Sequence, residues 1–328
     1  MTPTQRQHRY RVILAFALVY VFWGSTYLGI EEAVGKAGEA GVPPMLMAAT
    51  RFTIAGVLML AFLSLRGRNI RMPRRDFVQQ GIIGVLLLSI ANVVLAWAEQ
   101  WVPTGLAALL VSITPLWFLM LETWVFPGEH RFSGRTLIGL TLGIVGIVIL
   151  IWPELRHTSG IGRKEMFASL ILPLGSLSWA TGSVLSKRWK TAVDPFVATG
   201  WQMAIAGSVN FVVALALGEQ RVAVYSLHRW AAIIYLIIFG SWVGFSAYIW
   251  LLKHVPTPKV TTYAYVNPVV AVFLGWLILH EQITGYILAG TVIVVASVAL
   301  VTGAQNVKRN AGAAEMDGEL AKCEPASD

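Results

Sequence analysis

The chain has 328 residues, of which 56% are hydrophobic and only 13% are charged, and its mean hydropathy is +0.66. A soluble domain carries about 25% charged residues, so this composition excludes an ordinary soluble protein and points to a lipid environment. The formal net charge is +8, but the basic residues stand in short connections between apolar runs, which argues against a nucleic-acid-binding surface.

Ten apolar runs follow one another along the chain. Each has about 20 residues, the length that a helix needs to cross roughly 30 Å of hydrocarbon. Backbone groups in lipid must be paired within the segment, and runs of this length favour helices over barrel strands. In chain order the predicted spans are 11–30, 43–65, 77–98, 103–124, 134–152, 166–187, 195–217, 229–251, 257–279 and 285–303. We expect residues 1–10 to form a cytoplasmic leader, 153–165 a linker and 304–328 a polar, disordered tail.

Ten spans place both termini on the same side of the membrane, and the distribution of Lys and Arg indicates which side that is. Of the 25 basic residues, 18 fall in connections on the side of the termini, six fall on the other side, and Arg51 lies inside a span. Cytoplasmic connections are the ones enriched in Lys and Arg. The chain is therefore predicted to be a multi-pass protein of the bacterial cytoplasmic (inner) membrane, with both termini in the cytoplasm.

The first five spans and the last five read as the same unit written twice. The recurring pairs are Thr53–Gly56 (TIAG) with Ala204–Gly207 (AIAG), Val102–Thr104 with Val255–Thr257 (VPT in both), Pro115 with Pro268, and Glu129 with Glu281. Because five is an odd number, the second unit must enter the bilayer from the side opposite to the first. Inverted repeats of this kind are an architecture of secondary transporters, which bind substrate near the midplane between the halves. The predicted units are residues 11–152 and 166–303.

Several motifs, taken in order, resemble the EamA family of the drug/metabolite transporter superfamily over residues 11–303. They are WGSTYLGI at Trp23–Ile30, PPMLMAATRFTIAG at Pro43–Gly56, SWATGSV at Ser178–Val184, and the long run Ser246–Gly275. The resemblance implies an all-α polytopic membrane protein with ten transmembrane helices, arranged as two inverted five-helix EamA repeats. It also implies export of small metabolites, amino acids or drugs. The segment Glu31–Gly41 is longer and more acidic than we expect of close relatives, so contacts at that mouth transfer least well.

Arg51 is the only Lys or Arg well inside a span. A charge at that depth costs roughly 2.5–3.5 kcal/mol on insertion scales, so the side chain is expected to face the bundle interior and to have a partner. One interpretation is that Arg51 binds a substrate carboxylate or pairs with a gate acid, for which Glu31, Glu32 and Glu99 are candidates. The alternative is a structural arginine that bonds to backbone carbonyls or snorkels outward.

Pro115 and Pro268 lie in the middle of equivalent spans, and each removes a helical hydrogen bond and favours a kink. The polar residues that precede them are Ser112 and Thr114 in the first unit and Tyr265 and Asn267 in the second. Carbonyls freed beside polar side chains are what a midplane site uses, so we predict that these residues line the cavity. The alternative is a passive kink whose free carbonyl accepts a Ser or Thr hydroxyl.

Further candidates for the cavity wall are aromatic and polar residues that share helical faces. They are Tyr20, Trp23, Tyr27, Asn92, Trp97, Trp179, Ser183 and Tyr248. Together they predict a cavity suited to a small amphipathic or aromatic molecule. Taken singly, each is more often a residue that holds helices together or lies at the membrane interface.

The predicted function is a secondary transporter that exports small organic solutes, such as amino acids, related metabolites or drugs, by alternating access. No Walker A, HExxH or Gly-x-Ser-x-Gly motif and no Cys/His cluster occurs within a span, so we expect no enzymatic activity, cofactor or metal site. An intramembrane enzyme acting on lipid or isoprenoid substrates, and a non-transporting receptor or scaffold, remain as alternatives. Proton coupling is left open, because no carboxylate stands at the midplane.

Two smaller patterns bear on packing. Gly139 and Gly143 form a GxxxG pair, which permits close helix contact and is expected to pack against the tenth span of the same chain. We therefore predict a monomer or a weak homodimer. Glu129 and Glu281 stand at the starts of the fifth and tenth spans, where the helix dipole favours an acid, so capping is the expected role of both.

Overall fold

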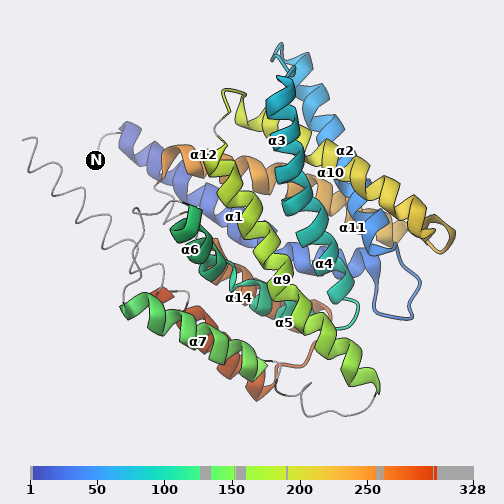
Figure 1. The fold of residues 1–328 in the computed structure, drawn as a ribbon, viewed down its shortest axis with the longest axis vertical. Coiled ribbons are helices and arrows are strands. Elements are labelled where there is room, and N and C mark those ends of the chain that lie inside the picture. Colours follow the sequence, from blue (N-terminus) through green and yellow to red (C-terminus); the bar gives the residue numbers. More distant parts are fainter. Residues whose placement is uncertain are drawn as a thin grey trace, which may run out of the picture.

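The computed structural model describes residues 3–125, 134–150, 152, 160–189, 191–255, 260, 262–297 and 299–300. All regular elements in these ranges are helices, which confirms the predicted all-α class for the described part of the chain (Figure 1). In the first half they are α1 (Pro3–Val34), α2 (Pro44–Leu65), α3 (Arg74–Gly84), η1 (Val85–Ile90), α4 (Ala91–Ala98), α5 (Thr104–Val111), α6 (Thr114–Val125) and α7 (Gly134–Leu150). In the second half they are α9 (Gly160–Arg188), α10 (Pro195–Leu217), η2 (Glu219–Arg221), α11 (Leu227–Tyr235), η3 (Leu236–Val243), α12 (Gly244–His254), α14 (Tyr263–Ile278) and a helix at Gly285–Ser297.

Seven helices within the described ranges are long and apolar enough to cross a membrane. They are Arg6–Val34, Pro44–Leu65, Arg74–Ala98, Thr104–Val125, Gly162–Arg188, Pro195–Leu217 and Leu227–Tyr248. Three shorter apolar helices, Thr141–Leu150, Val266–Ile278 and Gly285–Ser297, fall in the remaining predicted ranges. The count of ten spans therefore stays a prediction.

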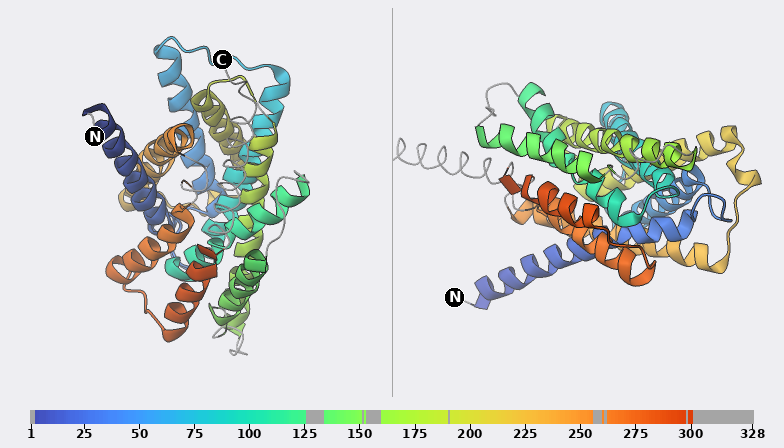
Figure 2. Two further views of the ribbon diagram at one scale, coloured as in Figure 1. Left: turned by 90° about the vertical axis from the view of Figure 1, so that its left-hand side faces the viewer. Right: turned by 90° about the horizontal axis from the view of Figure 1, so that it is seen from below.

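Helix α1 is longer than the predicted first span at both ends. It begins at Pro3, so the part of the expected leader that the structure describes is helical and projects from the bundle (Figure 2). It ends at Val34, so Glu31 and Glu32 belong to its last turn and not to a loop. The expected linker is likewise helical from Gly160 onward, while residues 153–159 and the expected tail lie outside the described residues.

Helices α2 and α10 pack against each other through the repeated TIAG and AIAG segments. A Cβ atom added to Gly56 would lie 2.4 Å from the backbone nitrogen of Ala204, and one added to Gly207 would lie 2.3 Å from that of Thr53. The contact is reciprocal, because Gly56 and Gly207 are equivalent in the repeat and so are Thr53 and Ala204. Small residues permit this close approach of two helices in a membrane.

Two of the long helices contain π-helical segments that the sequence did not reveal. Val85–Ile90 joins α3 to α4, and Leu236–Val243 joins α11 to α12. The two segments overlap when the repeats are aligned on Val102 and Val255. Single turns of π-helix occur often at functional sites, and both of these end next to the cavity described below.

The two proline-bearing spans differ in continuity. Helix α5 ends at Val111 and α6 begins at Thr114, so the first span is interrupted just before Pro115. Helix α14 runs through Pro268 without interruption. The predicted symmetry in sequence therefore does not produce the same local structure in the two halves.

Helix α7 packs against the helix Gly285–Ser297, and the two lie next to each other in both views of Figure 2. The Ser297 hydroxyl donates a hydrogen bond to the carbonyl of Gly139 (2.6 Å), and a Cβ at Gly143 would lie 2.8 Å from the Ser297 Oγ. This confirms the predicted contact of the GxxxG pair within the chain.

Connections between helices meet in two groups. At one end the Ala37 amide donates to the Gln100 carbonyl (2.9 Å), and the Val224 amide donates to the Gly41 carbonyl (3.0 Å). The α1–α2 connection therefore touches the connections that follow α4 and α10. These are odd-numbered connections in the predicted order of spans.

Even-numbered connections meet in the second group. Arg68, which follows α2, lies 3.7 Å from the carboxylate of Asp194, which precedes α10. Lys187 of α9 forms an ion pair with Glu122 of α6. Odd-numbered connections thus contact one another, and so do even-numbered ones. This pattern is expected when successive helices cross a layer in alternating directions.

Candidate substrate cavity

A cavity lies between the helices. Its volume is about 130 Å³, counted as the space that the centre of a water molecule can occupy. A single buried water needs about 10–15 Å³ on this measure, so the cavity has room for a small solute. Its wall comes from both halves of the chain: α1, α2, η1, α4, α5, α6, α9, η3, α12 and α14. The predicted residues that line it are Trp23, Tyr27, Arg51, Asn92, Ser112, Thr114, Trp179, Asn267 and Pro268.

Three predicted residues, Tyr20, Ser183 and Tyr265, are not part of the described cavity wall. The Tyr20 hydroxyl bonds to the Thr262 hydroxyl (2.6 Å), and the Ser183 hydroxyl donates to the Trp179 carbonyl one turn earlier (2.9 Å). The side chain of Tyr265 lies outside the described residues. Tyr20 and Ser183 do not line the described cavity: the Tyr20 hydroxyl links α1 to Thr262, and the Ser183 bond lies within α9.

Three others lie behind the wall. The ring of Trp97 packs on Phe167 of α9 with centroids 5.7 Å apart, and that of Tyr248 packs on Trp23 at 5.0 Å. Pro115 is near the cavity in sequence but does not line it. A shared helical face identifies the inner side of each helix, but not which residue on that side reaches the space.

Arg51 lines the cavity and is 4% exposed. Its Nε donates to the Ser241 hydroxyl (3.2 Å), and its guanidinium carbon lies 4.7 Å from the centroid of the Phe52 ring. A Cβ at Gly240 would lie 2.9 Å from the Arg51 Nη2, so glycine leaves the space that the guanidinium occupies. No carboxylate within the described ranges forms an ion pair with this arginine.

The other polar groups of the wall are mostly satisfied. The Ser112 hydroxyl donates to the Leu109 carbonyl (2.6 Å), and the Thr114 hydroxyl donates to the carbonyl of Val111 (2.5 Å), which is the group that Pro115 leaves without its helical donor. The Thr114 hydroxyl thus satisfies the carbonyl that Pro115 leaves free, while Ser112 and Thr114 both line the cavity.

Asn267 differs from these groups. Its side chain is 7% exposed, and its Oδ1 has no hydrogen-bond partner among the described residues. By contrast, the Asn92 amide donates to the Leu87 carbonyl (2.8 Å), inside the π-helical segment. Among the described residues of the wall, Arg51 is a cation and the Asn267 Oδ1 is a hydrogen-bond acceptor without a partner.

An aromatic surface completes the wall. Trp23 stands in edge-to-face contact with Trp179 (6.3 Å, 86°) and Tyr263 (5.1 Å, 89°), and its indole donates to the Gly240 carbonyl (3.2 Å). Tyr263 was not predicted, although it lies one helical turn before Asn267 on the same face. Following the face of Asn267 backwards along the sequence would have found it.

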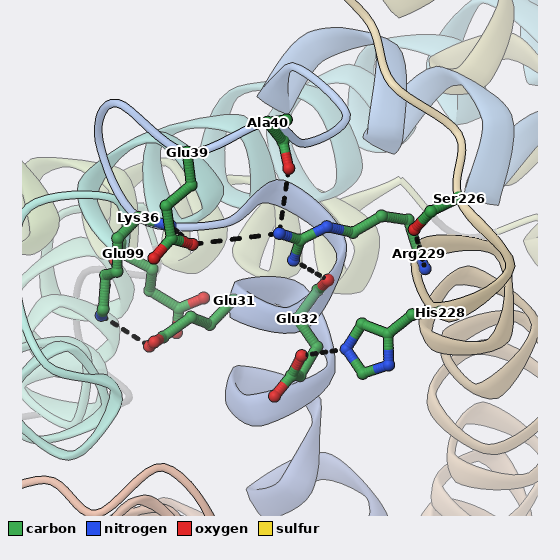
Figure 3. Close-up of polar contacts among 9 residues, drawn as sticks. All are labelled: Glu31, Glu32, Lys36, Glu39, Ala40, Glu99, Ser226, His228 and Arg229. Carbon is green, nitrogen blue, oxygen red and sulfur yellow. Dashed lines mark hydrogen bonds and ion pairs between the residues drawn. The ribbon is translucent and has the colours of Figure 1, made fainter.

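The three predicted gate acids lie away from the cavity wall, at the end of the molecule where the odd-numbered connections meet. Lys36 reaches Glu31 (2.6 Å) and donates to the carbonyls of Glu99 (3.1 Å) and Val102 (3.2 Å), as Figure 3 shows in part. The pairing of Arg51 with any of these acids is therefore wrong: the partner of Glu31 is Lys36.

A second set of contacts ties the same segment to α11. Glu32 pairs with His228, while Arg229 donates to the carbonyls of Glu32 and Ala40 and lies 3.9 Å from the carboxylate of Glu39 (Figure 3). Residues 31–41, which are the last turn of α1 and part of the loop after it, are thus anchored to the first half on one side and the second half on the other.

Two stretches of the chain match the model of the EamA-like transporter family: residues 10–152 and 166–303. The chain belongs to the EamA-like transporter family. The matched stretches differ by only one residue at one boundary from the repeat units predicted above. The EamA assignment also sets aside the intramembrane enzyme, because members and relatives of this family are transporters.

Among relatives of this EamA protein is the uncharacterized inner membrane transporter YedA of Escherichia coli K12, which is 35% identical over 90% of this chain and 92% of its own length. The uncharacterized transporter YvbV of Bacillus subtilis is 26% identical over 89% of this chain and 91% of its own length. A solved crystal structure of 20% identity covers 90% of this chain and 98% of its own with a TM-score of 0.63, which supports the fold alone.

Proposed function

We propose that this EamA protein is a secondary transporter of the bacterial cytoplasmic membrane that exports small organic solutes by alternating access. In this proposal ten helices form two inverted repeats with both termini in the cytoplasm. The reciprocal contact of Gly56 and Gly207 with the partner repeat supports a two-fold relation between the halves. The separate gathering of odd and even connections supports alternating helix directions.

The observation that carries the proposal is the buried Arg51, which has no ion-pair partner among the described residues and faces the cavity. A buried, unpaired charge is costly, so its retention indicates a ligand that supplies the opposite charge. A carboxylate on the solute would bond to the guanidinium. An amino or hydroxyl group would donate to the free Oδ1 of Asn267, and an apolar part would rest on the ring of Trp23.

The proposed solute is therefore a small carboxylate with a hydrogen-bond donor and an apolar or aromatic part, a description that includes amino acids and related metabolites. Two anchoring groups and one aromatic surface favour a compact molecule over a lipid. Residues 31–41 would close one end of the path to the cavity, because they bridge both halves there.

The test is flux in proteoliposomes with a panel of amino acids, other carboxylates and drugs. Wild type is compared with Arg51→Gln and Asn267→Ala, and Tyr20→Phe serves as a control outside the cavity. Losing a charge-assisted bond costs about 1.5–3 kcal/mol, so the half-saturating concentration should rise about 10- to 100-fold in Arg51→Gln. Wild-type flux in both cavity variants would remove the assigned site. Ligand binding without any flux would favour a receptor instead.

A further inference from the structure

Glu99, the residue after α4, is an acid that the transport proposal does not use. It is 0% exposed, and both of its carboxylate oxygens lack a hydrogen-bond partner among the described residues. The nearby Lys36 ammonium donates to the backbone carbonyl of Glu99 but pairs with the carboxylate of Glu31. In Figure 3 the Glu99 side chain lies beside this pair, under the segment 31–41.

Titratable and charged groups face Glu99 from several elements. They are Tyr27 and Glu31 of α1, Lys36 of the following loop, and Glu281 beyond α14. The other helices packed against α4 carry Arg51 on α2 and Lys164 on α9. Most of these groups are engaged with other partners: Arg51 bonds to Ser241, and Lys164 lies 4.5 Å from the ring centroid of Trp101.

Glu281 is committed to a helix end. Its carboxylate accepts hydrogen bonds from the Thr104 amide (2.6 Å), the Thr104 hydroxyl (3.1 Å) and the Gly105 amide (3.3 Å) at the start of α5. Those three hydrogen bonds engage the Glu281 carboxylate at the N-terminus of α5. Of the groups named above that act on Glu99, Lys36 is the cation, and its ion pair is with Glu31, so an ionised Glu99 would be left without compensation.

An ionised carboxylate that is buried without a donor is strongly disfavoured, and such a group takes up a proton instead. We propose that Glu99 binds a proton while the segment 31–41 closes this end of the cavity path, and that it releases the proton to water when the segment opens. The inference rests on the proposed transport function and names the ion to which the gate responds. Burial, reinforced by the charge of Glu31, also raises the pKa of Glu99 well above its ordinary value.

The link between proton and gate follows from what covers Glu99. Lys36 bonds to the carbonyls of Glu99 and Val102, and Ala37 bonds to Gln100, so the segment must break its bonds on either side of Glu99 when it leaves. Water would then solvate the carboxylate and favour the ionised form. Protonation must therefore favour the closed segment, and deprotonation the open one, by the same free energy.

The experiment uses full-length protein in detergent with Cys323→Ser and a reporter, Val102→Cys, at a buried position (1% exposed for the native Val102) whose carbonyl accepts from Lys36 of the segment. Maleimide labelling rates are measured against pH with Glu99 present and in Glu99→Gln. At each pH the labelling rate with Glu99 present is divided by the rate in Glu99→Gln, and this ratio cancels the pH dependence of the thiol itself. The expected ratio is near one in acid and rises with pH, by at most about tenfold per pH unit for one proton.

Controls separate the possible outcomes. Glu39→Gln removes an exposed acid of the same segment (60% exposed) and should keep the wild-type response. If Glu99→Gln does not fold, Glu99→Leu replaces it, because Leu252 stands at the equivalent position of the second repeat. A ratio that does not change with pH would overturn the proposal. Slower labelling on replacing choline with sodium at constant pH, only with Glu99 present, would assign the site to sodium and also overturn it.

The labelling needs no solute, so the two proposals fail separately. An unchanging ratio in a protein that still moves solute rejects the proton site alone. A normal pH response in a protein that moves no solute of the panel rejects transport and keeps the proton site.

Discussion

Gly56 of α2 lies so close to Ala204 of α10 that a single methyl group on Gly56 would stand 2.4 Å from the backbone nitrogen of Ala204. Its repeat equivalent, Gly207, stands in the same relation to Thr53. A backbone atom cannot move aside as a flexible side chain can, so the two helices would have to separate. The segment that most clearly revealed the repeat in the sequence is thus the place where the two halves touch.

We therefore expect Gly56→Ala to destabilise the protein by about 1–3 kcal/mol, the usual cost of overpacking. The measurement is the melting temperature of the purified protein. Gly81→Ala is the matched control, because a Cβ there meets only the Ile205 side chain, at 3.4 Å. Its melting temperature should equal or slightly exceed that of wild type, since Ala is the better helix former. Equal melting temperatures for all three proteins would show that α2 and α10 do not pack this closely.

Gly240→Ala should weaken the binding of carboxylates without unfolding the protein. The added methyl group would lie 2.9 Å from the Arg51 Nη2, which is the end of a flexible side chain, so the guanidinium would shift. We expect about a tenfold rise in the half-saturating concentration of a carboxylate solute, a change of about 1.4 kcal/mol. Competition by the corresponding amide, which does not need the cation, should be unchanged. An equal loss for acid and amide would mean that the methyl group only narrows the cavity.

Stability should fall as the pH rises, because the folded protein holds the proton on Glu99 more tightly than the unfolded chain does. Burial raises the pKa of this carboxyl, so between the ordinary Glu pKa of about 4.3 and the raised value the folded state binds more protons. The slope from this group is at most about 1.4 kcal/mol per pH unit. It should be absent in Glu99→Gln, so the difference in unfolding free energy between the two proteins is the quantity to follow. A constant difference across pH would contradict the raised pKa.

Glu281→Ala should destabilise α5, a helix in the other half of the chain. The carboxylate accepts from the Thr104 and Gly105 amides, and loss of a helix cap costs about 0.5–2 kcal/mol. Amide hydrogen exchange of the first turn of α5 should increase, while Glu39→Ala should leave it unchanged. Faster exchange at Gly285–Ser297 instead would support the sequence-based expectation that Glu281 caps its own span.

Cysteines at Arg66 and Arg188 should label from the same side of the membrane, and one at Ala40 from the opposite side, in a background with Cys323→Ser. The two arginines lie in even-numbered connections and Ala40 in an odd one. All three side chains are exposed. An impermeant maleimide applied to oriented vesicles measures this directly. Labelling of Arg66 and Arg188 positions from different sides would refute the inverted arrangement.

The helical class could be predicted from the sequence, because hydrophobic length is a local property. Nine of the residues proposed for the substrate site line the cavity of the described residues. The sequence did not predict which helix Glu281 caps, since its partner Thr104 is far away in the chain. The partner of Glu31 was missed for a different reason. The sequence suggested that the acids pair with Arg51 at the cavity, but Glu31 pairs with the nearby Lys36, and that contact depends on where α1 ends.

The paired π-helical segments set the direction in which the following residues point. A π-turn accommodates one residue more than an α-turn, and in an α-helix one residue corresponds to a rotation of about 100°. If Val85–Ile90 became regular α-helix with all its residues kept, Asn92 would turn by about 100° away from its present direction into the cavity, whereas removing one residue would nearly preserve that direction. The orientation of Asn92 therefore depends on the π-helical turn that accommodates this additional residue.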